Sequence, residues 1–212
     1  NFIRRRGAIA DNPLYAYQWH YPLINLPGAW DVADASGSGV IVAVLDTGVL
    51  GDHPDLQGQL VAGYDFVSST SQSLDGDGLD PDPTDPGDSP VGESSFHGTH
   101  VAGTVVAANN ATGGVGVAWG AKVMPLRVLG KEGSGTDADL VQAIRYAAGL
   151  DNASGTLPTQ RADIINMSLG GAGQSVSLGS AVEAAVAAGV IVIAAAGNEN
   201  SSLPSFPAAY PA

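Results

Sequence analysis

The stretch Val40-Ile41-Val42-Ala43-Val44-Leu45-Asp46-Thr47-Gly48 decides the fold. It begins as a continuous apolar, mostly β-branched run, which is typical of a parallel strand buried on both faces. Runs of the same character predict further strands at 122–128, 163–167 and 189–195. Helical patterns alternate with these strands, at 97–108, 136–149 and 177–188. This alternation predicts an α/β fold: a doubly wound, mostly parallel sheet with helices on both faces and its site beyond the carboxyl ends of the strands.

The segments around this framework carry weaker signals. Residues 1–27 show no periodicity and are interrupted by prolines, so we expect an arm that runs along the surface. Residues 28–35 predict a short helix, and residues 68–95 form a long insertion that is too polar to enter a core. Because no repeat or linker divides the chain, we expect residues 1–212 to form a single domain.

Composition excludes several classes of partner. The net charge of −13 argues against nucleic acid and anionic membranes. No apolar run reaches the ~18 residues that span a bilayer, so we expect no membrane partner. The absence of cysteine excludes disulfides and thiol chemistry. The chain begins with Asn and shows no leader, so a secreted form would already have lost its signal peptide and any propeptide.

Two polar residues stand out in apolar surroundings. Asp46 ends an apolar strand, where a carboxylate is costly unless it is paired. His97 opens a helix made of small residues, so its ring needs a function or a partner. Each of the two side chains therefore needs a partner or a function. An imidazole oriented by a carboxylate is the general base that acyl transfer to water requires.

Three motifs resemble, in their order along the chain, those of subtilisin-like serine proteases (subtilases) of the bacterial extracellular type. They are Val44 to Gly48, Phe96 to Thr104 (Phe-His-Gly-Thr-His-Val-Ala-Gly-Thr) and Ala194 to Asn198 (Ala-Ala-Ala-Gly-Asn). The resemblance runs from about Pro13 onward. It implies that Asp46 orients His97, that His97 is the base and that Asn198 donates a hydrogen bond to the oxyanion.

The nucleophile motif of that family, Gly-Thr-Ser-Met-Ala, does not occur in the 212 residues. We therefore expect a C-terminally incomplete fold, the N-terminal part of a peptidase domain. A companion C-terminal segment of the same precursor would carry the serine, and this chain alone would be inactive. As a whole, the resemblance implies a secreted, zymogen-derived hydrolase, an endopeptidase whose partners are protein or peptide substrates.

The resemblance also implies a substrate-binding region. Ser168, Leu169 and Gly170 would pair with the substrate backbone and form one wall of the primary specificity pocket. Ala195 and Gly197 would form the opposite wall. These walls consist of small residues and backbone, which leaves room for a large apolar P1 side chain. Glu199 either reaches the mouth of the pocket, where it would favour Lys or Arg, or is a solvated carboxylate.

Calcium is the expected cofactor, at one or two sites. For the first site, the resemblance implies the side chains of Asp55 and Asn110 and the carbonyl groups of Ala108, Thr112 and Gly114. Gln18 matches the position of a further side-chain ligand near the N-terminus. The second site would lie in residues 75–88, where six carboxylates within 14 residues repel one another unless a hard cation gathers them. Its candidate ligands are Asp75, Asp77, Asp80, Asp82 and Asp88; the alternative is a disordered acidic loop.

Other interpretations stay open. Asp46-Thr47-Gly48 also fits the signature of aspartic proteases, although only one copy is present and that class needs two carboxylates. The missing serine allows a non-catalytic pseudo-protease that receives peptides as an added strand along 168–170. His97 and His100 could form a zinc pair, but no third ligand is evident, so His100 is expected to be structural, as is His53.

Overall fold

Five parallel strands form one sheet in a computed structural model that describes residues 12–32 and 36–211. The strand order is β2-β3-β1-β4-β5. The bounds are β1 Ile41–Asp46, β2 Tyr64–Asp65, β3 Lys122–Arg127, β4 Ile164–Met167 and β5 Ile191–Ala194. The predicted parallel α/β sheet is thus confirmed. The sequence analysis missed β2, because a pair of residues shows no periodicity.

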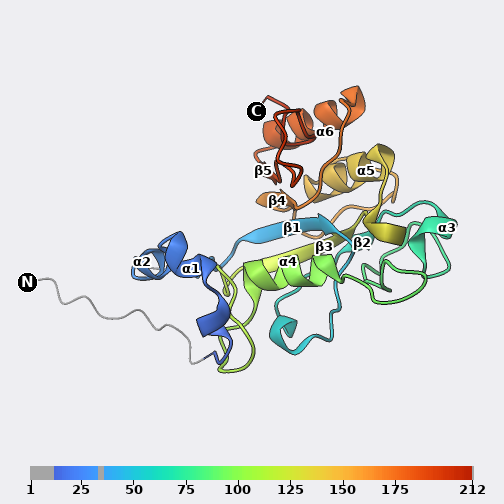
Figure 1. Cartoon of the computed structure of the whole chain (residues 1–212). Helices are drawn as coiled ribbons and strands as arrows, with labels where there is room; N and C mark the ends of the chain where they lie inside the picture. Colours follow the sequence, from blue (N-terminus) through green and yellow to red (C-terminus); the bar gives the residue numbers. More distant parts are fainter. Residues whose placement is uncertain (1–11, 33–35, 212) are drawn as a thin grey trace, which may run out of the picture.

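Three long helices cover the two faces of this sheet (Figure 1). Helix α4 (His97–Val106) packs on one side, against β1 and β3, whereas α5 (Asp137–Ala147) and α6 (Val176–Ala187) lie together on the other. Thr136 and Ser175 cap α5 and α6, since their hydroxyls accept the backbone N–H of Asp139 (3.1 Å) and Leu178 (3.4 Å). The predicted helices on both faces are therefore present, with ends that differ by one or two residues.

The pleat of β1 divides the core between the two faces. Ile41, Ala43 and Leu45 pack in the cluster that contains α5 and α6. Val42 and Val44 pack in the cluster that contains α4. Because side chains alternate along a strand, Asp46 points to the side of α4. The central strand thereby sends its terminal carboxylate toward the helix that begins with His97.

The N-terminal part of the chain is more ordered than an arm. From residue 12 onward it forms η1 (Tyr15–Tyr17), α1 (His20–Leu23) and α2 (Leu26–Trp30). Tyr21 is fully buried and packs with Leu26 and Val115 in a third apolar cluster. The helix predicted at 28–35 begins earlier and ends at Trp30; residues 33–35, like 1–11 of the predicted arm, lie outside the described residues.

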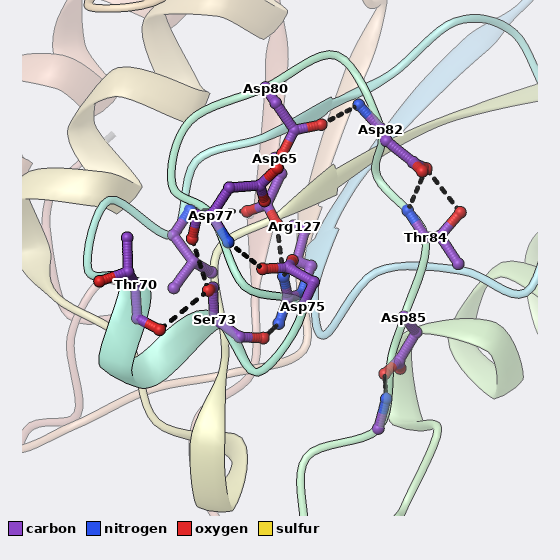
Figure 2. Close-up of polar contacts among 12 residues, drawn as sticks. Asp65, Thr70, Ser73, Asp75, Asp77, Asp80, Asp82, Thr84, Asp85 and Arg127 are labelled. Atoms are coloured by element: carbon purple, nitrogen blue, oxygen red, sulfur yellow. Dashed lines mark hydrogen bonds and ion pairs between the residues drawn. The ribbon is translucent and has the colours of Figure 1, made fainter.

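The insertion at 68–95 contributes buried groups, which corrects the expectation that it is too polar to enter the interior. Its short helix α3 (Thr70–Ser73) ends beside Arg127, the last residue of β3. The fully buried guanidinium of Arg127 donates to Asp65, to Asp75 and to the carbonyl of Ser73 (Figure 2). A buried cation thus holds the insertion against the end of the sheet and balances part of its acidity.

The other end of the sheet is open. Among the described residues, strand β5 pairs only with β4, and its residues Ile191 and Ile193 are 60% and 52% exposed. Two further short helices are η2 (Pro54–Leu56) and η3 (Lys131–Gly133). In the part of the chain that the structure describes, every helix is too short or too polar to cross a membrane.

Candidate active site

His97 and Asp46 form the pair that the sequence predicts. The Nδ1 atom of His97 lies 2.8 Å from Oδ1 and 3.0 Å from Oδ2 of Asp46. The Asp46 side chain is 1% exposed, whereas that of His97 is 48% exposed. The carboxylate is therefore shielded from water, while the imidazole reaches the surface on the side of the cleft.

Backbone amides also hold Asp46 in place at the end of β1. The amide of Thr47 donates to Asp46 Oδ1 (2.8 Å), and the carbonyl of Asp46 accepts the amides of Val128 (2.8 Å) and Leu129 (3.1 Å). Burial raises the pKa of Asp46, and the hydrogen bonds from His97 and Thr47 oppose this rise. Because the charged form needs these donors, the carboxylate is kept in one orientation toward the ring.

Gly98 allows the helix of His97 to approach β1. A Cβ atom on Gly98 would lie 2.2 Å from the carbonyl oxygen of Gly48 and 3.0 Å from Cβ of Asp46. Such contacts would force the start of α4 away from the strand end. A small residue directly after the histidine is therefore a condition for the short Asp46–His97 hydrogen bond.

A cleft of about 550 Å³ lies beside His97, and Asn198, the remaining catalytic candidate, lines it as well. Its walls include His97, Ser168 and Asn198, which come from α4 and from the segments after β4 and β5. Another wall consists of Gly133, the last residue of η3, and of Ser134 and Gly135, which lead to α5. The sequence analysis assigned no site to these three residues; the run of small residues was the available signal for a segment that a substrate can approach.

The predicted substrate-binding residues line one adjoining pocket of about 330 Å³. Ser168, Leu169 and Gly170 line it together with Ala195 and Gly197. Glu199 lines it too, and its Oε2 accepts the backbone N–H of Asn198 (2.8 Å). Because Glu199 is also exposed to solvent, the role of its carboxylate in substrate binding stays a prediction.

The pocket has a further wall that the sequence analysis missed. Leu203, Pro204 and Ser205 line it, and the following Phe206 exchanges two backbone hydrogen bonds with Gly171 (3.0 and 2.9 Å). The role of this segment at the pocket depends on the distant pairing of Phe206 with Gly171, which no local pattern marks.

The candidate residues of the first calcium site lie around Asn12. Its Nδ2 donates to the carbonyls of Ala108 (3.2 Å), Thr112 (2.7 Å) and Gly114 (2.5 Å). Asn12 is buried, and its Oδ1 has no hydrogen-bond partner in the part of the chain that the structure describes. Three carbonyls that converge on one point, beside an unpaired amide oxygen, fit the oxygen ligands that Ca²⁺ prefers.

Two of the side chains predicted for this site, those of Asp55 and Asn110, accept hydrogen bonds from the loop that carries the carbonyls. Asp55 is close, since its Oδ2 accepts the amide of Gly114 (3.1 Å), and Asn110 Oδ1 binds the amide of Thr112 (3.1 Å). Gln18 lies beside Gly114, but the hydrogen bonds of its amide go to the backbone of Val115 (2.8 and 3.2 Å), so its role as a calcium ligand stays a prediction. Sequence reasoning missed Asn12, which occupies the place expected for Gln18.

The second candidate calcium site, in the acidic insertion, coincides with a further pocket of about 240 Å³. Its lining residues are Asp75, Asp77, Asp80, Asp82, Thr84 and Pro86. Desolvation and the neighbouring charges of Asp80 and Asp75 raise the pKa of Asp77, as expected where carboxylates crowd together. Within the described residues, however, no three or more His, Cys, Asp or Glu side chains are arranged to hold a metal ion.

Asp88 does not belong to this pocket, which corrects its assignment as a ligand. Its two oxygens accept the amide (2.8 Å) and the hydroxyl (2.5 Å) of Ser95. These two hydrogen bonds are the main reason why the pKa of Asp88 is lowered. His53 has a structural role as well, because its Nδ1 accepts the amide of Asp55 and caps η2. His100 lies away from the catalytic pair's cleft, in a groove lined by Trp19, His53 and other residues.

Comparison with known proteins agrees with this geometry. The family model described as the subtilase family matches residues 37–212. The chain belongs to the subtilase family. This membership overturns the alternative of an aspartic protease, and the partner of Asp46 is a histidine rather than a second carboxylate.

Individual subtilases cover most of the chain. An extracellular protease of Xanthomonas campestris pv. campestris is 45% identical over 85% of this chain and 32% of its own length. An intracellular serine protease of Paenibacillus polymyxa is 40% identical over 84% of this chain and 46% of its own. A solved protease structure from Pseudoalteromonas arctica has 44% identity and a TM-score of 0.88, over 93% of this chain and 62% of that one. The chain thus spans about one third to two thirds of these relatives.

Proposed function

We propose that this chain supplies the acid–base pair and the oxyanion donor of a serine endopeptidase. In this proposal Asp46 orients His97, His97 removes the proton of the attacking serine, and the Asn198 amide donates to the oxyanion. The hydrogen bond of 2.8 Å between His97 and a buried Asp46 is the observation that carries the proposal. Since Asp46 engages Nδ1, the other ring nitrogen, Nε2, is the atom that takes the proton.

A companion C-terminal segment of the same precursor would supply the serine. Strand β5 supports this part of the proposal, because a strand with apolar, exposed residues and an unpaired edge favours the addition of another strand. The greater length of the relatives agrees with it. The segment would add the next strand and place a serine Oγ within hydrogen-bond reach of His97.

Calcium would stabilise the folded state at two places. One ion would be held by Asn12, Asp55, Asn110 and the carbonyls of Ala108, Thr112 and Gly114. It would take the place of the Asn12 Nδ2 donor among the three carbonyl oxygens. Asp75, Asp77, Asp80, Asp82 and Thr84 would hold the other after a rearrangement, since the aspartates among the described residues are not arranged as a metal site. At both places the ion would stabilise loops and take no part in the chemistry.

Substrates would be proteins or peptides with a large apolar P1 residue and some tolerance of basic ones. The relatives are named both extracellular and intracellular proteases. We propose the secreted, zymogen-derived form, and fractionation of the native producer tests it: activity that requires this chain should be found in the medium rather than in the cell.

The decisive experiment compares the purified 1–212 chain with the complete product of its gene. A serine-directed phosphonate should label the complete protein and abolish its peptidase activity, whereas the 1–212 chain should be neither labelled nor active. A complete protein that binds peptides, resists the phosphonate and does not hydrolyse would contradict the proposal and favour the peptide-binding pseudo-protease. Robust phosphonate-sensitive cleavage by the verified 1–212 chain would contradict the companion segment.

A further inference from the structure

Asp85 is a buried carboxylate that none of the roles above uses. It belongs to the polar insertion but is only 2% exposed. In Figure 2 it lies beyond Thr84, away from the carboxylates that gather around Arg127. A buried carboxylate is costly unless donors compensate for its lost hydration, so the partners of Asp85 indicate its function.

These partners lead to both members of the catalytic pair. Asp85 Oδ2 accepts the hydroxyl of Thr47 (2.5 Å), and Oδ1 accepts the amide of Gly87 (2.8 Å). The same Thr47 hydroxyl accepts the backbone N–H of Gly98 (3.0 Å). Thr47 directly follows Asp46, and Gly98 directly follows His97. A continuous set of hydrogen bonds therefore joins Asp85 to the neighbours of both residues.

The roles of donor and acceptor in this set are determined by chemistry. A threonine hydroxyl has one proton to donate and lone pairs with which to accept. While the proton of Thr47 is given to Asp85, a lone pair of the oxygen remains directed at Gly98. The amide of Gly98 is one of the N–H groups at a helix start that have no partner within the helix, and Phe96, before α4, offers no side-chain cap. Without Asp85, the hydroxyl is free to rotate away from this amide.

Backbone packing holds Asp85 in this position. The carbonyl of Pro83 accepts the amide of Val49 (3.0 Å). A Cβ atom on Gly48, whose φ is +99°, would lie 2.7 Å from that carbonyl and 3.0 Å from the amide nitrogen of Asp85. The insertion is thus seated directly on the end of β1, so the position of Asp85 depends on the strand that it helps to hold.

We propose that Asp85 is a positioning residue which, through the Thr47 hydroxyl, fixes the strand end that carries Asp46 against the helix start that carries His97. Asp85 does not contact substrate; it acts on the geometry of the general base. The kinetic consequence rests on the proposed function. A base that is displaced or reoriented lowers the rate of the chemical step more than it lowers substrate binding.

The test uses the complete protease and four variants: Asp85→Ala, Thr47→Val, Thr47→Ser and, as a matched control, Glu93→Gln, an exposed carboxylate of the same insertion. Active sites are counted with the serine-directed phosphonate, so that misfolded protein does not enter kcat. We expect Asp85→Ala and Thr47→Val each to lower kcat by about 10- to 100-fold with KM within about twofold. Thr47→Ser keeps the hydroxyl and should restore most of kcat, and Glu93→Gln should match the unmodified enzyme.

The double variant Asp85→Ala/Thr47→Val tests whether the two residues act as one unit. If they do, its kcat should equal that of Thr47→Val alone; a multiplied loss would overturn the proposal. Unchanged kcat per titrated site in Asp85→Ala would overturn it as well.

A second readout separates this inference from the proposed function. The low-field proton NMR signal of His97 Nδ1 reports its hydrogen bond with Asp46 without any turnover. It should shift or broaden in Asp85→Ala and Thr47→Val, and stay unchanged in Thr47→Ser and Glu93→Gln. A complete protein without peptidase activity would contradict the proposed function, whereas an NMR signal that does not respond to Asp85→Ala would contradict the role of Asp85.

Discussion

The Nδ1 atom of His97 lies within hydrogen-bond distance of both carboxylate oxygens of Asp46, at 2.8 and 3.0 Å, from a position 51 residues further along the chain. Replacing Asp46 with Asn in the complete protease should lower kcat by about 10³- to 10⁴-fold, because the amide no longer selects the tautomer or stabilises the imidazolium. Steady-state kinetics on a peptide anilide measure this effect. His100→Gln, on the same helix, is the matched control and should retain activity; an equal loss in both variants would contradict the assignment.

Asn12→Asp should convert the convergent carbonyls into a stronger and more calcium-dependent site. Without calcium, the new carboxylate faces the three carbonyl oxygens that Asn12 Nδ2 now binds, so the melting temperature should fall below that of the unmodified protein. With calcium, it should rise above it, since binding to the folded state contributes ~2.7 kcal/mol at a hundredfold excess over Kd. Thermal unfolding with calcium and with a chelator checks both signs.

Gln18→Glu provides the matched control for this site. Gln18 binds Val115 rather than the three carbonyls, so its substitution should change the melting temperature by the same amount with and without calcium. Melting curves of the unmodified protein that superimpose in calcium and in chelator would contradict both calcium sites. Chelation should also open the 75–88 loop to proteolysis.

Glu199→Gln should alter the choice between basic and apolar P1 residues. Glu199 lines the pocket between segments 168–170 and 195–197, where an exposed ion pair with Lys is worth ~1 kcal/mol or less. We expect kcat/KM to fall several-fold for a Lys-P1 substrate and to stay constant for a Phe-P1 substrate. Because Glu199 also binds the amide of Asn198, an equal fall on both substrates would show that it acts on the oxyanion loop instead.

Tyr21 should make the free energy of unfolding fall in alkaline solution. Burial raises its pKa from 10.0 to about 12, although a hydrogen bond from Gln18 opposes the rise. Between these values the unfolded chain has lost the phenolic proton while the folded protein retains it. The contribution of this group to stability is therefore complete below pH 10 and is lost as the pH rises toward 12, by about 1.4 kcal/mol per pH unit.

The variant Tyr21→Phe removes this titration, so its free energy of unfolding should fall less steeply over the same pH range. Tyr17→Phe, at an exposed position of the same region, is the control and should follow the unmodified protein. Denaturant unfolding at several pH values, with phenolate absorbance read in parallel, measures the difference. Parallel stability curves for the unmodified protein and Tyr21→Phe would contradict the assignment.

Ile193→Lys should reduce self-association of the isolated 1–212 chain. Ile193 is exposed on the edge strand β5, and a charge there discourages the addition of a strand from another molecule. Light scattering against concentration measures association. Val186→Lys, on α6 and away from the edge, should leave it unchanged. A strictly monomeric unmodified chain would show that the edge is not a site of association.

The sequence predicted the fold well where the residue pattern within a single segment is sufficient to identify a helix or strand. Apolar runs such as 40–45 are typical of parallel strands buried on both faces, and this predicted the parallel sheet. The exposure of Ile191 and Ile193 on β5 was not predictable in this way, because it depends on the neighbours of the strand. The pairing of Asp46 with His97 was predicted from the resemblance to subtilases, since burial indicates only that the carboxylate needs some partner.

What the sequence could not predict depends on contacts between distant segments. Asn12 binds carbonyls about a hundred residues away, and no local pattern marks it as different from other loop asparagines. Strand β2 is held by Arg127, whose charge in an apolar strand shows only that some partner exists. The wall of the specificity pocket after Leu203 is positioned by Phe206 and Gly171, which pair across 35 residues of chain.

Because side chains alternate along β1, we expect evolution to conserve the number of residues in this strand. Val42 and Val44 face α4, and Asp46 shares their side only because it is an even number of residues further along. One inserted or deleted residue between them would turn the carboxylate toward α5 and α6 while leaving the composition of the strand almost unchanged. A loop such as 68–95 is not subject to this alternation, whereas an alignment with any active relative should have no gap between Val42 and Asp46.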